Sequence, residues 1–345
     1  MRTPGSSQQF ETMLERSGEF PRRLKPILHE RHEKPLIVVE CDAKGTDIEP
    51  VLVAARQFAD AGVDGVSVSD NALARLRICS VALSHLIQEV AGVRAICHKT
   101  CRDTNLLGMH SLLLGASRLR VNTILAITGD KMALGEFERH ARGVFDLNSI
   151  RLVELLSSLN KGRTLLGREV PGPAADFEIG VGFNPNVSSL SDEIERLGQK
   201  IAVGAHFALS QLVFDPDVLS QMYRSTHHLN IPILLGIAPL VSLKNARFIN
   251  DKIMHGQMPA AILGRMAAVE GDRSAEALTG LAISKEHISL ALSLGASGFY
   301  LVTPLGRTDM VLELVNHIKE EYSKGNWRNR IQSRAGGLRL RVEAA

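Results

Sequence analysis

The chain has little of several features that define particular protein classes. Its 345 residues include only 4 cysteines and 4% aromatic residues, and the cysteines do not fall into paired CxxC motifs. No apolar run approaches the roughly 20 residues needed to span a bilayer, and the N-terminus lacks a charged segment followed by an apolar signal core. We therefore expect a cytoplasmic protein that is not inserted into a membrane and has no disulfide framework.

An excess of charge of one sign is also lacking. The 40 basic and 37 acidic residues leave a formal charge of +3, which gives no reason to expect a nucleic-acid partner. The basic excess collects at the C-terminal end, where a polar Lys324-Gly325-Asn326 break precedes Arg328, Arg330, Arg334, Arg339 and Arg341. This segment is either a solvated tail or a docking tail.

Short apolar runs alternate with longer segments of helical spacing, which is typical of parallel strands joined by crossover helices. With 45% hydrophobic residues, the chain is long enough for one large core. The number of runs predicts an α/β fold, a (β/α)8 TIM barrel in a single domain. The expected strands are residues 36–41, 65–69, 94–99, 123–128, 178–183, 207–214, 232–237 and 298–303.

The same pattern sets the expected boundaries. Residues 1–34 form an N-terminal extension, residues 35–323 form the barrel and residues 324–345 form the basic tail. Residues 70–90 and 189–203 have the spacing of outer helices. The connection at 131–146 is a candidate wall or lid of the active site, and the connection at 245–285 should hold extra helices before the last strand, one of which opens at Pro259-Ala260. A doubly wound open sheet is the alternative, but no glycine-rich dinucleotide motif follows the first strand.

Polar side chains recur where the predicted strands end. Each could be a helix cap or a satisfied core group, yet the C-terminal ends of parallel strands meet at one end of a barrel, so the set predicts a shared polar site. Its members are Glu40, Asp70, Asn71, His98, Thr100, Asp130, Asn184, Asn186 and Gln211. His98 also lies between Cys97 and Cys101, but side chains on a strand alternate between faces, which favours a structural reading over a metal site.

Some of these positions suggest particular chemistry. Glu40 shares a strand face with Val38 and Asp42, and apolar neighbours would keep a proton on its carboxyl group and make it a general acid; the alternative is a salt-bridged glutamate. Gly129 permits close backbone approach to a flat ligand and Asp130 adds a negative charge, although the pair also suits a simple turn.

Arg196 and Lys200 lie four residues apart on a predicted helix and so share a face. They are either a solvated face or a pair of cations for a cofactor diphosphate.

An ordered set of segments resembles the methylenetetrahydrofolate reductases, in particular the reductase half of bacterial proteins fused to a homocysteine methyltransferase. The resemblance runs from about Pro35 to Tyr322, and each motif is weak alone while the ordered set is specific. The segments are Val38-Val39-Glu40-Cys41-Asp42, Val68-Ser69-Asp70-Asn71, residues 98–105, 124–130 and 143–150, Asn184-Pro185-Asn186, residues 204–211, Gly236-Ile237-Ala238-Pro239-Leu240 and Tyr300-Leu301-Val302-Thr303-Pro304.

This resemblance implies a barrel that binds FAD and reduces 5,10-methylenetetrahydrofolate to 5-methyltetrahydrofolate. Glu40 would be the acid that assists opening of the bridged ring, and Asp130 would tune the flavin and the pterin. Gln211 would bind the pterin edge, and Tyr300 and Arg307 would line the folate side. The implied cofactor contacts are Ser69, His98, Thr128, Gly129, Asp130, Asn184, Arg196 and Lys200.

The chain departs from the family pattern at two places. Asp42-Ala43-Lys44 stands where many relatives have two prolines, so we expect a reshaped wall near Glu40. The aromatic residue that stacks on nicotinamide in well-known members is replaced near Leu243, which leaves the electron donor open. NADH, NADPH, a ferredoxin or a partner redox subunit could supply electrons to an enzyme that we expect to be oligomeric. The alternatives are a redox subunit that needs another chain for activity and a flavin-free pterin methyltransferase barrel.

Overall fold

A closed barrel of eight parallel strands, in the order β1 to β8, organises the chain. The computed structural model describes residues 34–43, 45–132 and 135–324, so the predicted extension before residue 34 and the arginine-rich tail after residue 324 lie outside the described residues. The strands are β1 Leu36–Glu40, β2 Gly65–Val68, β3 Ala95–Thr100, β4 Thr123–Ile127, β5 Glu178–Phe183, β6 Phe207–Leu212, β7 Ile233–Ile237 and β8 Gly298–Val302.

The predicted (β/α)8 fold is confirmed, since helices follow the strands in alternation. The helices are α2 Glu49–Asp60, α3 Ser80–Ala91, α4 Leu106–Arg118, α5 Ser149–Asn160, α6 Leu190–Ala202, α7 Pro216–Thr226, α8 Leu243–Lys252, α9 Ala260–Ala267, α10 Arg273–Ser293 and α11 Thr308–Ser323. Helices α8, α9 and α10 stand between β7 and β8, so the extra helices expected before the last strand are present, and α9 begins directly after Pro259. None of the described helices combines the length and apolarity needed to cross a membrane.

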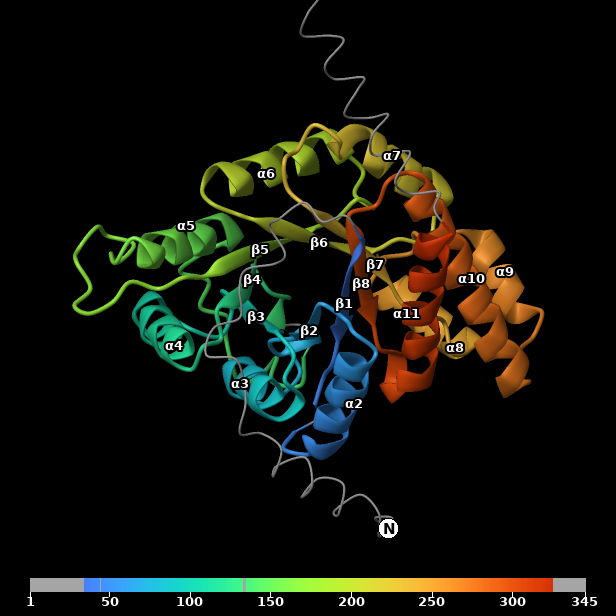
Figure 1. Cartoon of the computed structure of the whole chain (residues 1–345), viewed down its shortest axis with the longest axis horizontal. Helices are drawn as coiled ribbons and strands as arrows, with labels where there is room; N and C mark the ends of the chain where they lie inside the picture. Colours follow the sequence, from blue (N-terminus) through green and yellow to red (C-terminus); the bar gives the residue numbers. More distant parts are fainter. Residues whose placement is uncertain (1–33, 44, 133–134, 325–345) are drawn as a thin grey trace, which may run out of the picture. The chain divides into compact units, whose positions relative to one another are not determined.

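The density of internal contacts divides the chain into two compact units. Within the described residues, unit 1 contains 38–182 and 195–208, and unit 2 contains 34–37, 183–194 and 209–324. In unit 1, helices α2 to α5 lie outside strands β2 to β4 (Figure 1). In unit 2, an apolar cluster packs α8, α9 and α10 together and includes Leu243, Met266 and Ile283.

The strands of unit 1 are buried on both faces, as expected for a parallel sheet covered by helices. All residues of β2 and β3 are buried, including the polar His98, Lys99 and Thr100. The register pairs Glu40 with Ser67 and Thr100 with Ile127. Consecutive strands therefore end at nearly the same level, and the polar residues at their ends are brought together.

The helix predicted from Asp70 begins only at Ser80, so the first half of that prediction is wrong. Residues 71–79 form a loop that contains the short 3-10 helix η2 Ala72–Ala74. In this loop Asn71, Leu73 and Ala74 have φ values of 49°, 55° and 53°. Three backbone N–H groups in this loop donate to side chains. Leu73 and Leu76 donate to Asp130 and Glu136, which are distant in the sequence, and Arg77 donates to Asn71 within the same loop. These acceptors replace the carbonyls that a helix would provide, and helical spacing alone cannot reveal them.

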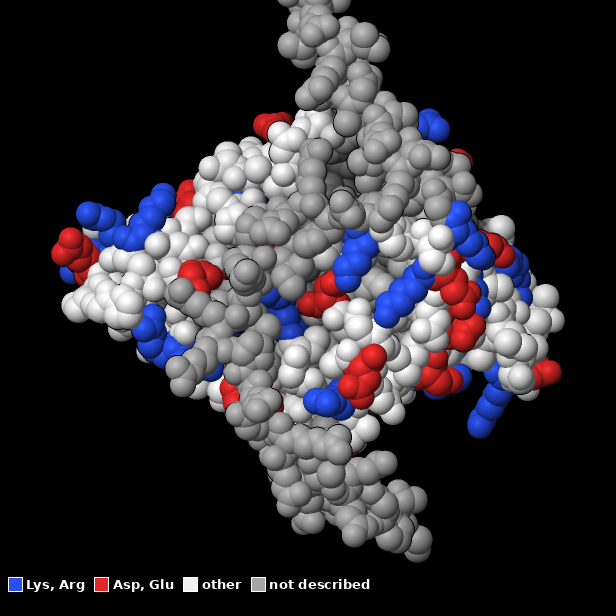
Figure 2. Space-filling model, in the orientation of Figure 1, with Lys and Arg blue, Asp and Glu red and all other residues white. Residues whose placement is uncertain are grey.

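The two charge signs are mixed on the molecular face in Figure 2, where blue and red side chains lie among white ones over the described residues. This mixture agrees with the small formal charge of +3.

Candidate active site

A cavity of about 270 Å³ opens at the C-terminal ends of strands β1 to β4, inside unit 1. Loops at this end build the active site of a barrel. The volume lies near the lower end of the usual range for ligand pockets, so it suits one ring system better than a whole dinucleotide. The residues that line the cavity are Glu40, Ser69, Asp70, Ala72, His98, Thr100, Ile127, Gly129 and Asp130.

The structure brings Glu40 and Asp130 to the same cavity, as the strand-end pattern predicts. Glu40 is the last residue of β1 and is half-buried. Asp130 follows β4 by three positions and is exposed, and its Oδ2 accepts a 2.7 Å hydrogen bond from the backbone N–H of Leu73. One wall therefore offers a partly shielded carboxyl group and another offers a carboxylate with a fixed orientation.

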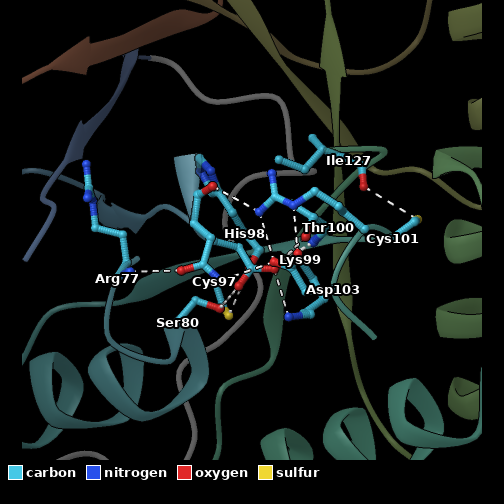
Figure 3. A network of polar contacts seen from close by, with 12 residues as sticks. Arg77, Ser80, Cys97, His98, Lys99, Thr100, Cys101, Asp103 and Ile127 are labelled. Carbon is cyan, nitrogen blue, oxygen red and sulfur yellow. Dashed lines mark hydrogen bonds and ion pairs between the residues drawn. The ribbon is translucent and has the colours of Figure 1, made fainter. Parts of the chain in front are cut away.

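Asp70 is the centre of the buried polar network beside this cavity. Its Oδ2 accepts hydrogen bonds from Lys99 Nζ at 2.7 Å and from both the N–H and the hydroxyl of Thr100 at 2.9 Å. Its Oδ1 accepts from the Ser80 hydroxyl at 3.2 Å, which ties the start of α3 to the same carboxylate. Figure 3 shows Lys99, Thr100 and Ser80 around this network. Asp70 thus holds the Thr100 side chain in one position on the cavity wall.

Lys99 carries the matching positive charge inside the protein. Burial opposes the charged form, but the charge and hydrogen bond of Asp70 outweigh it and raise the pKa of Lys99. The side chains of Lys99 and Asp70 are only 6% and 7% exposed. Each therefore neutralises a charge that would otherwise be buried without a counter-ion.

His98 is held neutral at the inner side of the cavity. Burial lowers the pKa of His98 to about 4, although Asp42 and Asp70 act in the opposite direction. Its Nε2 contacts the hydroxyl of Ser67, which is fully buried on β2. A neutral imidazole brings hydrogen-bonding nitrogens to the cavity wall without a charge.

Gly129 forms part of the wall next to Thr100. Its φ of +93° lies in the left-handed region, and a Cβ atom placed on it would lie 2.8 Å from Thr100 Cβ. The absent side chain therefore allows the Gly129 backbone to pack directly against Thr100 in the cavity wall.

Ser69 supplies a hydrogen-bonding group that the described protein does not use. The residue is 5% exposed, and its Oγ atom has no hydrogen-bond partner among the described residues. Its backbone N–H donates to Asp42 Oδ1 at 3.2 Å, which fixes the residue. A buried hydroxyl without a partner is costly, and its position on the cavity wall favours a ligand as the missing partner.

Other predicted cofactor residues in unit 1 lie in different surroundings. Thr128 does not line the cavity, and its hydroxyl accepts from the Ser149 N–H at the start of α5. Lys200 is buried and donates to the Gly182 carbonyl at 2.7 Å, whereas Arg196 is exposed. The two cations of α6 therefore share a helix face but not an environment.

The remaining predicted residues belong to unit 2. Asn184 Oδ1 accepts from the N–H of Asn186, and Gln211 Oε1 accepts from the next residue in the chain. Tyr300 is 9% exposed. Arg307 forms an ion pair with Asp309 at 2.6 Å. Within unit 2, these contacts fix several side chains, but they do not show what those side chains would bind.

Two residues that shape the site have no predicted role. The sequence pattern marks Lys99 only as the end of a strand and Arg102 only as part of a motif. Both are buried in the structure, at 5% and 1% exposure. The sequence does contain a signal for both residues. Each is a basic residue at or just after the end of a strand that is predicted to be covered on both faces, and a buried positive charge needs an acidic partner.

The cysteines near the site are free thiols. Burial raises the pKa of Cys97 and of Cys101 to about 12. They are therefore thiols rather than thiolates at neutral pH. Across the described ranges, no group of three or more His, Cys, Asp or Glu side chains is arranged to hold a metal ion.

Comparisons with known proteins agree with this architecture. A family model described as methylenetetrahydrofolate reductase matches residues 29–319. A relative from Caenorhabditis elegans, a "Probable methylenetetrahydrofolate reductase (NADPH)", is 23% identical over 259 residues, which cover 73% of this chain and 37% of the relative. The chain thus spans little more than a third of that relative's length.

A solved structure shares the fold. It is an uncharacterized protein from Clostridium thermocellum that binds two copies of 5-methyl-5,6,7,8-tetrahydrofolic acid, and it superposes with a TM-score of 0.55 at 15% identity, over 84% of this chain and 96% of the other.

Proposed function

The chain belongs to the methylenetetrahydrofolate reductase family, and we propose that it reduces 5,10-methylenetetrahydrofolate to 5-methyltetrahydrofolate with FAD as its cofactor. The observation that carries the proposal is the pair of acids on one cavity, Glu40 at the end of β1 and Asp130 after β4. The product would supply methyl groups for methionine biosynthesis in the cytoplasm.

Two features of the cavity fit a flat cofactor ring. Gly129 lines the cavity with backbone alone and packs directly against Thr100, and the buried Ser69 hydroxyl lacks a partner among the described residues. When bound, FAD supplies the hydride that the reduction requires. Ser69, His98, Gly129 and Asp130 would hold its ring, while the diphosphate would lie outside this small cavity, where we assign Thr128, Asn184, Arg196 and Lys200.

Glu40 would move the proton in this reaction. Its carboxyl group is half-buried and lines the cavity. From the cavity wall it would protonate the folate nitrogen that leaves the bridging carbon, which makes that carbon a better hydride acceptor.

Asp130 would act through its charge. The Leu73 N–H fixes its Oδ2, and a negative charge held beside the cofactor ring disfavours additional negative charge on that ring. Gln211, Tyr300 and Arg307 are the residues that we assign to folate, on the strength of the family pattern.

The test uses the purified full chain with FAD, NADH or NADPH, and methylenetetrahydrofolate under anaerobic conditions. We expect the wild type to bind FAD, to be reduced by a donor and to be reoxidised by the folate. Glu40→Gln should bind FAD but turn over at least about a hundredfold more slowly, because general acid catalysis contributes about 10²- to 10⁴-fold. Glu154→Gln, which removes a half-buried acid of α5 that does not line the cavity, should keep wild-type turnover.

Other results would favour other functions. If Glu40→Gln reduced the folate as fast as the wild type, the acid assignment would be wrong. Bound FAD that neither nicotinamide donor reduces would point to a redox subunit that receives electrons from a ferredoxin or a partner protein. A colourless preparation that still binds methyltetrahydrofolate would point to a flavin-free methyltransferase.

A further inference from the structure

Arg102 is a fully buried cation that the proposed chemistry does not yet use. It lies two residues after β3 and is 1% exposed. Its Nε and Nη2 donate to the two carboxylate oxygens of Asp103 at 2.7 and 2.8 Å. This two-point contact fixes the plane of the guanidinium group. The hydrogen bonds that Arg102 donates to Asp103 raise the pKa of Arg102, so the group is always charged.

The same guanidinium group reaches the loops that follow the two neighbouring strands. Nη2 donates to the backbone carbonyl of Asn71, after β2, at 3.0 Å. Nη1 donates to the backbone carbonyl of Asp130, after β4, at 3.3 Å. One side chain therefore links three consecutive strand ends of unit 1. Figure 3 labels Asp103, the ion-pair partner of Arg102, within the polar network.

A second route connects Arg102 to Asp130. Asn71 donates from its side chain to Asp103 at 3.1 Å and accepts from the Arg77 N–H at 2.9 Å, so both ends of the turn at 71–77 are held. Inside this turn, the N–H of Leu73 donates to Asp130 Oδ2. Arg102 thus fixes the main chain of Asp130 directly and its carboxylate through the turn.

The turn needs this support because its backbone is strained. Asn71, Leu73 and Ala74 have φ values near +50°, and neither leucine nor alanine favours that region. Such conformations persist only where the surrounding contacts determine them. Without Arg102 the turn would relax, and the Leu73 N–H would leave the Asp130 carboxylate.

We propose that Arg102 is a positioning residue that sets where the Asp130 carboxylate lies in the cavity, and thereby the reactivity of the site. This inference rests on the proposed function, in which Asp130 faces the reacting groups. Lysine cannot replace arginine here, because its single ammonium lacks the planar set of donors that reaches Asp103 and two carbonyl groups at once.

The experiment compares Arg102→Lys with Arg94→Lys in the full chain. Arg94 precedes the same strand at its other end, is 5% exposed and pairs with Glu178 at 3.1 Å, and it does not line the cavity. Both substitutions remove a buried guanidinium and keep a charge. Asn71→Gly is a second variant that should fold readily, since glycine tolerates the positive φ while the side-chain bonds to Asp103 and Arg77 are lost.

Three measurements separate positioning from stability. In Arg102→Lys, amide hydrogen exchange in residues 71–77 should rise about tenfold or more, and the reduction potential of bound FAD should become more positive. Turnover should fall about ten- to a hundredfold with the KM for folate within about twofold, as expected for a misplaced group. Asn71→Gly should change all three in the same direction by less. Arg94→Lys should lower the melting temperature and leave all three at wild-type values.

The outcomes are distinct. Faster exchange in residues 71–77 with wild-type potential and turnover would overturn the inference, and so would unchanged exchange in Arg102→Lys. If Arg102→Lys did not fold, the same two comparisons in Asn71→Gly would decide. Failure of the proposed function would appear earlier, in wild-type protein that neither binds FAD nor reduces the folate.

Discussion

Gly129 offers a direct test of how closely the walls of the cavity approach each other. In Gly129→Ala, the new Cβ would lie 2.8 Å from Thr100 Cβ and 3.3 Å from Arg102 Cβ. Neither atom is the free end of a flexible side chain. Thr100 is also held by the hydrogen bonds of its N–H and hydroxyl to Asp70, so the threonine cannot turn away without losing them.

Two costs add up at this position. A left-handed backbone conformation costs a residue other than glycine roughly 1–2 kcal/mol. Overpacking of a tight site costs about 1–3 kcal/mol more. We therefore expect Gly129→Ala to lower the free energy of unfolding by about 2–5 kcal/mol.

Gly92→Ala is the matched control because it keeps the first cost and removes the second. Gly92 caps α3 with a φ of +67°, and no atom lies within 4 Å of a Cβ placed there. Its substitution should cost about 1–2 kcal/mol. Urea denaturation of both variants, followed by far-UV circular dichroism, gives the difference, and FAD titration should show weaker binding only for Gly129→Ala. Equal destabilisation of the two variants would refute the close approach of Gly129 and Thr100.

Further predictions concern the buried charges and the histidine of unit 1. Lys99→Met should lower the free energy of unfolding by about 3–5 kcal/mol, because it leaves Asp70 buried without its counter-ion. Arg94→Met should lower it by a similar amount, because it leaves Glu178 buried without its counter-ion. Only Lys99→Met should also weaken FAD binding. For His98 the pKa is about 4 in the folded chain and 6.5 in the reference state, so the unfolded state takes up the proton first as the pH falls. The free energy of unfolding should therefore decline by about 3 kcal/mol between pH 6.5 and pH 4. Urea denaturation at several pH values measures this decline, and a decline of the same size in His98→Gln would contradict the assignment to His98.

Much of the fold could be predicted because the strands are buried and therefore stand out in the sequence as short apolar runs. The apolar run at residues 178–183 coincides with β5, and the other expected strands agree with the observed ones within two residues at either end. Parallel strands of similar length end at one level, so Glu40, His98 and Asp130 could be placed in one site before their contacts were known.

The details of the site depended on contacts between distant residues, which spacing does not record. The spacing at residues 70–90 is helical throughout, yet Asp130 and Glu136 accept the N–H groups of Leu73 and Leu76, and residues 71–79 form no α-helix but only the short 3-10 helix at 72–74. The helical spacing places Lys200 beside Arg196, but only the fold shows that its ammonium donates to the Gly182 carbonyl. A sequence shows which polar groups exist, whereas their partners are known only from the fold.

The pairing of Asp70 with Lys99 constrains how this protein can change over evolutionary time. Loss of either side chain alone leaves a charge isolated from water, and a chain of marginal stability is poorly able to survive such an intermediate. Replacing Asp70 by asparagine and Lys99 by methionine at the same time removes both charges and still leaves a side-chain oxygen that can accept the Thr100 N–H. These two positions, 29 apart in the sequence, should therefore be inherited as a couple, and a family alignment should show them changing together.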